Sequence, residues 1–249
     1  AGIGTEGLIL DGTAHTTLAF VQTFPNGDRD FSFYRDPGAD MLLRADEVPE
    51  ALVRDTSVFH FGTLSMTHEG VREATKKAVA AAKESGALIS FDPNLRPPLW
   101  AGLEEARGQI AWGLSHCDIL KIADNEIEFL TGEADHDRAA DMLRASYPNI
   151  RLLNVTEGAA GSRCLYGDTK VFVPAFLLGG TVDTTGAGDT FCACVLHFVL
   201  ENGLDGLTAP QLTGMLRFAN AAAYLVTTRK GAIRSMPAPG EIDDILRKN

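Results

Sequence analysis

Residues 183–189, of sequence DTTGAGD, place two acids and two hydroxyls around a glycine-rich turn. A helix is predicted to begin there, because Phe191, Val195 and Phe198 recur at helical spacing. A glycine-rich turn that opens a helix presents unpaired backbone N–H groups and the positive end of the helix dipole, which together form an anion site. A carboxylate would repel an anion that only rested there, so Asp189 indicates a general base beside a phosphoryl group. The simpler alternative is that Asp189 only caps the helix.

Two other phosphate-binding motifs are absent from the sequence. No G-x-x-x-x-G-K-[ST] run occurs, which excludes a P-loop enzyme. Gly186 and Gly188 lack the third glycine of a dinucleotide-binding fingerprint. The turn at 183–189 therefore belongs to a different class of phosphate-binding motif.

Polar residues also follow three of the predicted strands. Asp92, Asn94 and Arg96 lie among prolines after a buried strand, where they form either a recognition site or a rigid turn. Asn125 and Glu128 share one face of a predicted helix and could hold a hydrated Mg²⁺, although helix capping by Asn125 explains the pair about as well.

A loop of small residues, TEGAAG at 156–161, follows another predicted strand. Such a loop could admit a nucleotide close to its backbone. An ordinary tight connection between strands is the equal alternative.

The hydrophobic periodicity predicts an α/β fold in which strands and helices alternate. Alternation of this kind forms a mostly parallel sheet with helices on both faces. Two early strands joined by a Pro-Asn-Gly-Asp turn form a β-hairpin outside that alternation, and we expect this segment, about 16–36, to act as a lid. Strands are predicted at 17–23, 30–34, 58–62, 87–91, 119–122, 151–155, 163–166 and 171–174, and helices at 67–85, 104–114, 126–130 and 138–145, with two more after residue 189.

Composition bounds the function further. The chain of 249 residues is 45% hydrophobic, which suits one main domain spanning 1–249. A formal net charge of -11 argues against nucleic acid and anionic membrane surfaces as partners. Four cysteines without a C-x-x-C pair favour reduced thiols and a cytoplasmic location.

The run DTTGAGD, together with the strand-end segments and their order, resembles the ribokinase-like (PfkB) family of carbohydrate kinases and is most similar to its fructokinases. Cys194 departs from the pattern, because a small Gly or Ala is usual there. The resemblance covers the chain from about Gly4 to Pro237. It implies an ATP-dependent kinase that converts fructose to fructose 6-phosphate.

The resemblance also implies roles for individual residues. Asp189 would accept the proton of the sugar hydroxyl, beside an anion hole of backbone amides. Two further groups of residues would contact ATP and the sugar. The anion hole would comprise Gly186, Ala187 and Gly188, the ATP contacts Asn125, Thr156, Gly158, Gly161, Gly188 and Asn220, and the sugar contacts Arg35, Asn94, Arg96 and Asp189.

Two metal ions are implied by the same resemblance. Glu128 would organise Mg²⁺ indirectly with the phosphates. K⁺ would occupy a monovalent-cation site formed largely by backbone carbonyls. The cation-site residues would be Asp183, Thr185, Val226, Arg229, Gly231 and Ser235.

Several alternatives stay open at this stage. The acceptor could be 2-keto-3-deoxygluconate, ribose or a nucleoside, or the chain could be a non-catalytic sugar- or nucleotide-binding regulator. A homodimer formed through the lid is a further expectation. Because nothing before Gly4 matches the first strands of the family, we also expect an N-terminal part of the fold to be missing from this chain.

Overall fold

A computed structural model describes residues 2–24 and 29–248 of the chain. It divides into two compact units. The first comprises residues 1–20, 31–120 and 145–150, and the second comprises 21–30, 121–144 and 151–249. The single domain predicted over 1–249 stays a prediction.

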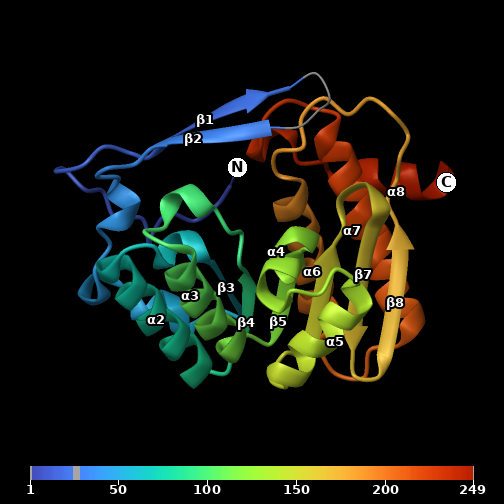
Figure 1. The fold of residues 1–249 in the computed structure, drawn as a ribbon, viewed down its shortest axis with the longest axis horizontal. Coiled ribbons are helices and arrows are strands. Elements are labelled where there is room, and N and C mark those ends of the chain that lie inside the picture. Colours follow the sequence, from blue (N-terminus) through green and yellow to red (C-terminus); the bar gives the residue numbers. More distant parts are fainter. Residues whose placement is uncertain (1, 25–28, 249) are drawn as a thin grey trace. The chain divides into compact units, whose positions relative to one another are not determined.

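The predicted early strands are present as a two-stranded sheet. It consists of β1 (Leu18–Thr23) and β2 (Arg29–Tyr34) (Figure 1). β1 contains four consecutive apolar residues at 18–21, whereas in β2 Phe31 and Phe33 flank Ser32. The predicted turn at 25–28 lies outside the described residues.

Parallel strands form the sheet of the first unit. β3 (Val58–Gly62) pairs with β4 (Leu88–Asp92), and β4 pairs with the start of β5 (Ile119–Ala123), both in parallel. These strands are rich in Ile, Leu and Phe, as expected of strands that are buried on both faces. Two helices, α2 (Glu69–Glu84) and α3 (Leu103–His116), pack on this sheet, while the short α1 (Glu50–Arg54) contacts α2.

The second unit places helices around strands β6 (Leu152–Thr156), β7 (Gly161–Tyr166) and β8 (Thr169–Pro174). These strands pair antiparallel in sequence order. In Figure 1, α7 lies behind β7 and β8, and it packs on both of them. The helices of this unit are α4 (Asp124–Thr131), α5 (His136–Ser146), α6 (Ala187–Asn202), α7 (Ala209–Thr227) and α8 (Pro239–Lys248).

The predicted alternation of strands and helices is confirmed, with some additions. β7 pairs antiparallel with both β6 and β8, whereas β3, β4 and β5 pair in parallel. The prediction of two closing helices is incomplete, because α8 follows α7. Ile242, Ile245 and Leu246 of α8 pack against a core cluster formed with α7, so an apolar stripe explains this helix too.

The described residues contain no helix that is long and apolar enough to span a membrane. All four cysteines are free thiols. Burial raises the pKa of Cys117 and of Cys164 to about 12, so neither is a reactive thiolate near neutral pH.

Candidate active site

The glycine-rich turn at 183–189, the signature turn, leads into the N-terminus of α6, as predicted. Gly186 adopts the left-handed conformation, with φ 83°, and is the N-cap of the helix. Its carbonyl accepts a hydrogen bond from the Thr190 amide at 2.8 Å. The Ala187 amide donates to the Thr184 carbonyl at 3.3 Å, whereas the amides of Gly188 and Asp189 have no acceptor among the described residues. The Gly186 amide likewise has no acceptor among these residues, so of the anion hole predicted at 186–188 only the Ala187 amide is already engaged.

Asp189 is the third residue of α6 and its side chain is exposed. A capping acid at this position would accept a hydrogen bond from the amide of the N-cap residue. Within the part of the chain that the structure describes, the Asp189 carboxylate makes neither a hydrogen bond nor an ion pair. Capping therefore does not explain Asp189, and its carboxylate can accept a proton.

A lysine that the sequence analysis did not single out lies beside this turn. Lys121 belongs to β5 and is only 6% exposed. Its Nζ atom lies 3.1 Å from the position that a Cβ atom on Gly188 would occupy. A glycine at 188 thus leaves room for an ammonium group at the start of α6.

Asp183 joins the signature turn to the loop after α7. One carboxylate oxygen accepts the Thr185 amide at 2.9 Å, and the other accepts the Gly231 amide at 3.1 Å. The Thr227 carbonyl in turn accepts the amides of Val182 and Asp183. These bonds fix the shape of both loops.

The residues predicted for a monovalent cation meet at this junction in part. The Thr185 hydroxyl is buried and has no hydrogen-bond partner in the described structure. Ser235 is buried and donates to the Lys230 carbonyl at 2.7 Å. The Arg229 side chain forms an ion pair with Glu241 of α8, so only its backbone can serve a cation. Buried hydroxyl, carboxylate and carbonyl oxygens are the ligands that hard cations such as K⁺ prefer, so these residues fit the ion.

The loop at 156–161 is held by a buried ion cluster. Glu157 accepts hydrogen bonds from Arg163, and His136 Nδ1 lies 2.9 Å from its carboxylate. Burial raises the pKa of Glu157, but the hydrogen bonds from Arg163 and His136 outweigh that effect and hold the pKa below its usual value. The Glu157 amide also donates to the Gly161 carbonyl at 2.8 Å. The loop is therefore rigid, while the backbone at Gly158 borders open space.

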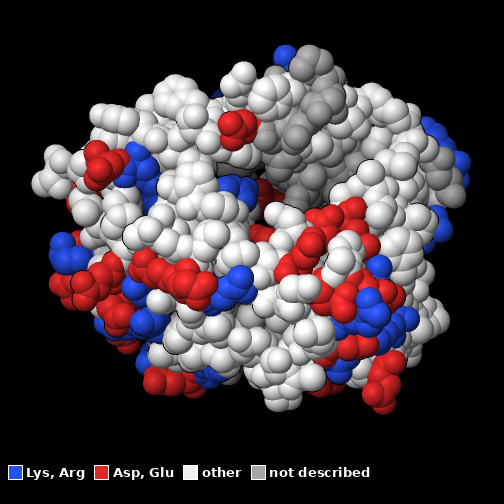
Figure 2. Space-filling view, viewed as in Figure 1, with Lys and Arg blue, Asp and Glu red and all other residues white. Residues whose placement is uncertain are grey.

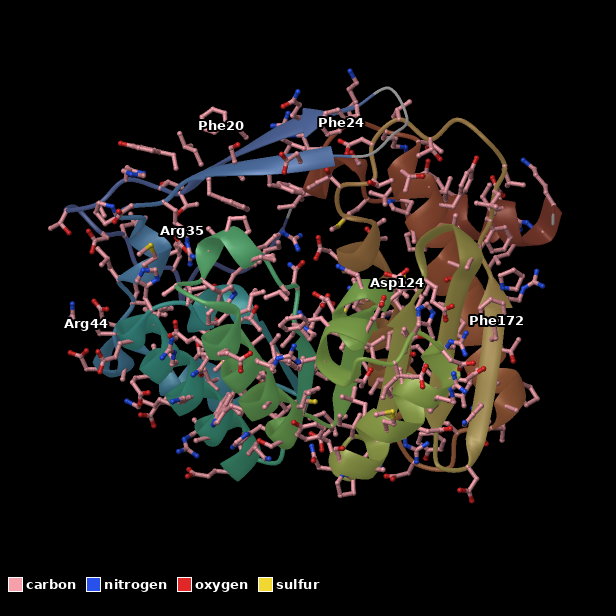
Figure 3. All side chains as sticks on the ribbon, viewed as in Figure 1. Phe20, Phe24, Arg35, Arg44, Asp124 and Phe172 are labelled. Carbon is pink, nitrogen blue, oxygen red and sulfur yellow. The ribbon has the colours of Figure 1, made fainter. Side chains whose placement is uncertain are left out.

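The two residues predicted on α4 do not face the protein interior. Asn125 and Glu128 are both exposed. The buried acid of the helix is Glu126, which is 5% exposed and accepts the Ala123 amide at 2.9 Å. Acidic side chains gather on the surface over α4, with Asp124 at the start of the helix (Figures 2 and 3).

Asn220 has a structural role that the sequence did not reveal. Its side-chain oxygen accepts a hydrogen bond from Ser162, at 2.8 Å. Its amide group donates to the carbonyls of Val173 and Pro174. Because these bonds use both donors and the acceptor of its side chain, Asn220 positions the strands β7 and β8, and its contact with ATP stays a prediction.

Arg35 is anchored within the first unit (Figure 3). It is buried and donates to Asp40 at 2.8 Å, to the Thr67 hydroxyl at 3.0 Å and to the Leu64 carbonyl at 2.9 Å. These bonds tie the end of β2 to the segment after β3, and the contact of Arg35 with the sugar stays a prediction.

The segment at 92–96 lies in the same unit and is rigid. Thr63 donates to the Pro93 carbonyl through both its amide and its hydroxyl. Asn94 has a φ of 44°, and its amide donates to the Asp92 carboxylate at 3.2 Å. The Arg96 guanidinium lies 5.3 Å from the centre of the Phe31 ring, in cation–π contact. Asn94 and Arg96 are both partly exposed and retain polar groups for a ligand.

Comparison with known proteins shows which family shares this sequence and fold. Residues 1–239 match the model of a family described as pfkB family carbohydrate kinase. Probable fructokinase-2 of Arabidopsis thaliana is 43% identical over 245 residues, which cover 98% of this chain and 74% of the relative. Fructokinase-1 of Zea mays is 40% identical over 247 residues, or 99% of this chain and 76% of the relative.

Solved structures agree with the sequence comparison. A fructokinase with bound ATP from Xylella fastidiosa matches 99% of this chain and 78% of its own, with a TM-score of 0.87 and 31% identity. A fructokinase from Vibrio cholerae O395, in a form with bound fructose, ADP and calcium ion, matches 97% of this chain and 76% of its own, with a TM-score of 0.84 and 26% identity. The predicted fold, that of these sugar kinases, is confirmed.

Proposed function

Because the chain belongs to the pfkB family of carbohydrate kinases, we propose that it transfers the terminal phosphoryl group of ATP to fructose and forms fructose 6-phosphate. The observation that carries this proposal is the start of α6. A carboxylate and backbone amides without partners among the described residues meet a lysine ammonium group there, and these are the groups that phosphoryl transfer to a hydroxyl requires.

The proposed reaction assigns each of these groups a role. Asp189 accepts the proton of the sugar hydroxyl as the hydroxyl oxygen bonds to the γ-phosphorus. The bond from that phosphorus to ADP breaks, and its electron pair stays on the ADP oxygen. The amides of Gly188 and Asp189 donate to the oxygens of the moving group, where the charge is largest. Positioning of the two substrates supplies much of the remaining rate.

ATP would lie along the strand ends of the second unit. Gly158 can admit the nucleotide next to its backbone, since open space surrounds it. Thr156 is the last residue of β6, and Asn125 follows the end of β5. Both stay predicted contacts of ATP. In the first unit, Asn94 and Arg96 are the proposed sugar contacts, and Arg35 holds the segment that carries the lid.

Magnesium bound with ATP would reduce the negative charge of the phosphates. Among the residues that the structure describes, no group of three or more His, Cys, Asp or Glu side chains forms a metal site. Magnesium that arrives with a triphosphate needs only one or two carboxylates from the protein. Glu126 of α4 is buried, whereas Glu128 of the same helix is exposed, so burial favours Glu126 over the predicted Glu128.

The pair Glu126→Gln and Glu128→Gln tests this assignment. We expect Glu126→Gln to raise the Mg²⁺ concentration for half-maximal activity by about tenfold, because the neutral amide no longer attracts the hydrated ion. Glu128→Gln should leave that concentration nearly unchanged. The reverse ranking, measured by magnesium titration at fixed ATP, would restore Glu128 as the magnesium residue.

Potassium should activate the enzyme. We propose that the ion lies between the Thr185 hydroxyl, Asp183 and nearby backbone carbonyls, where it holds the two loops that frame the anion hole. Replacing Na⁺ by K⁺ at constant ionic strength should raise kcat. Thr185→Val removes the hydroxyl ligand and should weaken this dependence. Equal rates in both salts would show that the ion has no role.

The proposal includes a cytoplasmic enzyme that forms a homodimer through the lid. Four free cysteines support the location. Phe20 (Figure 3) and Tyr34 are large hydrophobic side chains of β1 and β2 that are 61% and 56% exposed, and they support the interface.

A panel of acceptors tests the proposed substrate. ADP release with ATP would be measured for fructose, ribose, 2-keto-3-deoxygluconate and adenosine. Fructose should give the highest kcat/KM, by at least about tenfold. Preference for another acceptor would reassign the substrate within the family, and no turnover with any of them would favour the non-catalytic regulator.

A further inference from the structure

The loop at 156–161 contains one half of a cluster of ionisable side chains that the proposed reaction does not use. The centre of the cluster is the ion pair of Glu157 in the loop with Arg163 of β7, whose side chains are 7% and 13% exposed. The His136 Nδ1 atom lies 2.9 Å from the Glu157 carboxylate, and Arg163 forms a second ion pair with Asp137. Since His136 and Asp137 begin α5, the cluster ties the loop to both β7 and α5.

The geometry of the central pair fixes one arrangement. Arg163 donates to one carboxylate oxygen of Glu157 through Nε and to the other through a terminal nitrogen. Such a two-point contact sets the relative orientation of its partners as well as their distance. The guanidinium group also lies 5.6 Å from the centre of the Phe172 ring, and Phe172 is the partner of Arg163 in the pairing of β7 with β8. The arginine is therefore held in place, and it holds Glu157 in turn.

The remaining residues of the loop have no polar side chain that could fix it. Gly158, Ala159 and Ala160 follow Glu157, and all three are exposed. A backbone hydrogen bond from the Glu157 amide to the Gly161 carbonyl closes the loop. The Glu157 side chain thus anchors the closed loop to the elements around it.

Stability of the sheet does not require a pair of this kind. Replacement of a buried ion pair by apolar side chains of similar volume is often neutral or stabilising. A bidentate pair does, however, specify a single orientation, and a loop with one orientation binds a ligand without the loss of conformational freedom that ordering would cost.

We propose that Arg163 is a positioning residue that acts through Glu157 to hold the loop at 156–161 in the shape that binds ATP; this inference rests on the proposed function. Arg163 binds two carboxylates and does not contact the nucleotide. Without the pair, ATP would have to order the loop as it binds, so its affinity would fall. The transfer step takes place at the start of α6 and would keep its rate.

Two single variants remove the pair from either side. Arg163→Met and Glu157→Gln should each raise the KM for ATP by about tenfold, while kcat and the KM for fructose change by less than about twofold. Arg138→Met is the control, because Arg138 is an exposed arginine of the same unit that pairs with Glu133 outside the loop. It should leave all three constants unchanged. Wild-type KM values for ATP in both single variants, or a fall in kcat as large as the rise in KM, would refute the positioning role.

The double variant that combines Arg163→Met with Glu157→Gln provides the decisive measurement. If Arg163 acts through Glu157, the affinity of the double variant for ATP should fall by about tenfold, as in each single variant, because the same interaction is lost. Independent roles would multiply the two losses to about a hundredfold and would contradict the proposal.

Arg163→Lys separates positioning from folding. It keeps the charge but not the planar fork, so its affinity for ATP should fall between those of the wild type and Arg163→Met, with a Tm near the wild-type value. Neutral variants that fail to fold beside an Arg163→Lys with wild-type affinity would show that the charge serves the fold alone. Failure of all the variants to fold would refute the proposal in the same way.

Calorimetry with a non-hydrolysable ATP analogue and Mg²⁺ keeps this test independent of catalysis. Wild-type protein that binds the analogue but turns over no fructose would refute the kinase assignment, and the Kd values of the variants would still decide the role of Arg163. Wild-type turnover of fructose together with unchanged Kd values in the variants would refute only the role of Arg163.

Discussion

Asp189→Asn is expected to lower kcat by at least about a hundredfold while the affinity for ATP stays nearly intact. The amide has the size of the carboxylate but cannot accept the proton of the sugar hydroxyl. Since Asp189 has no hydrogen-bond or ion-pair partner within the described residues, the substitution breaks no contact that supports the fold. Steady-state kinetics with varied ATP and varied fructose separates the two effects.

Asp141→Asn is the matched control for this experiment. Asp141 is an exposed aspartate of α5, bound to Lys170 at 2.6 Å. Its replacement should leave kcat unchanged. Near-normal turnover by Asp189→Asn, with the control also active, would remove Asp189 from the mechanism.

Gly161→Ala should destabilise the protein by about 3 kcal/mol, which corresponds to a fall of roughly 10 °C in Tm. Gly161 has a φ of 130°, a region that side chains rarely allow. An added Cβ atom would lie 2.2 Å from the Val173 carbonyl oxygen and 2.8 Å from the Pro174 Cα atom. Both are backbone atoms of β8, so relief of the clash requires the pairing of Gly161 with Pro174 to break.

Gly167→Ala is the control that separates the steric clash of an added Cβ atom from the cost of a positive φ. Gly167 also has a positive φ, 52°, but its Cβ position borders open space. It should cost only about 1 kcal/mol. Thermal unfolding of both variants checks the difference, and similar Tm values for the two would contradict the close contact between Gly161 and β8.

The signature turn could be predicted from the sequence because the residues that form it are consecutive. A helix start and an acid in the first turn both follow from the run at 183–189, and the structure places each of them there. The strands and main helices were equally predictable, because apolar periodicity depends on residues within one element. The closing helix α8 was missed, although Ile242, Ile245 and Leu246 form an apolar stripe.

Contacts between distant segments could not be predicted in the same way. Helical spacing shows that Asn125 and Glu128 share a face, but it does not show whether that face is buried. Only the structure shows that Glu126 points inward instead. Asn220 is similar, since its partners Ser162 and Val173 are 58 and 47 residues away in sequence.

Lys121 shows the same limit most clearly. In the sequence it interrupts an apolar strand, and that interruption was the available signal. Its meaning depends on the approach of Gly188, which lies on a separate element. A charged residue inside a predicted buried strand therefore merits attention as a candidate site residue.

Phosphorus NMR of the reaction of ATP with fructose tests the central claim most directly. The account predicts that the wild-type protein consumes ATP, releases ADP and forms fructose 6-phosphate in equal amounts, and that Asp189→Asn forms almost none in the same time. Release of inorganic phosphate without a sugar phosphate, or equal product from the wild type and the variant, would contradict it.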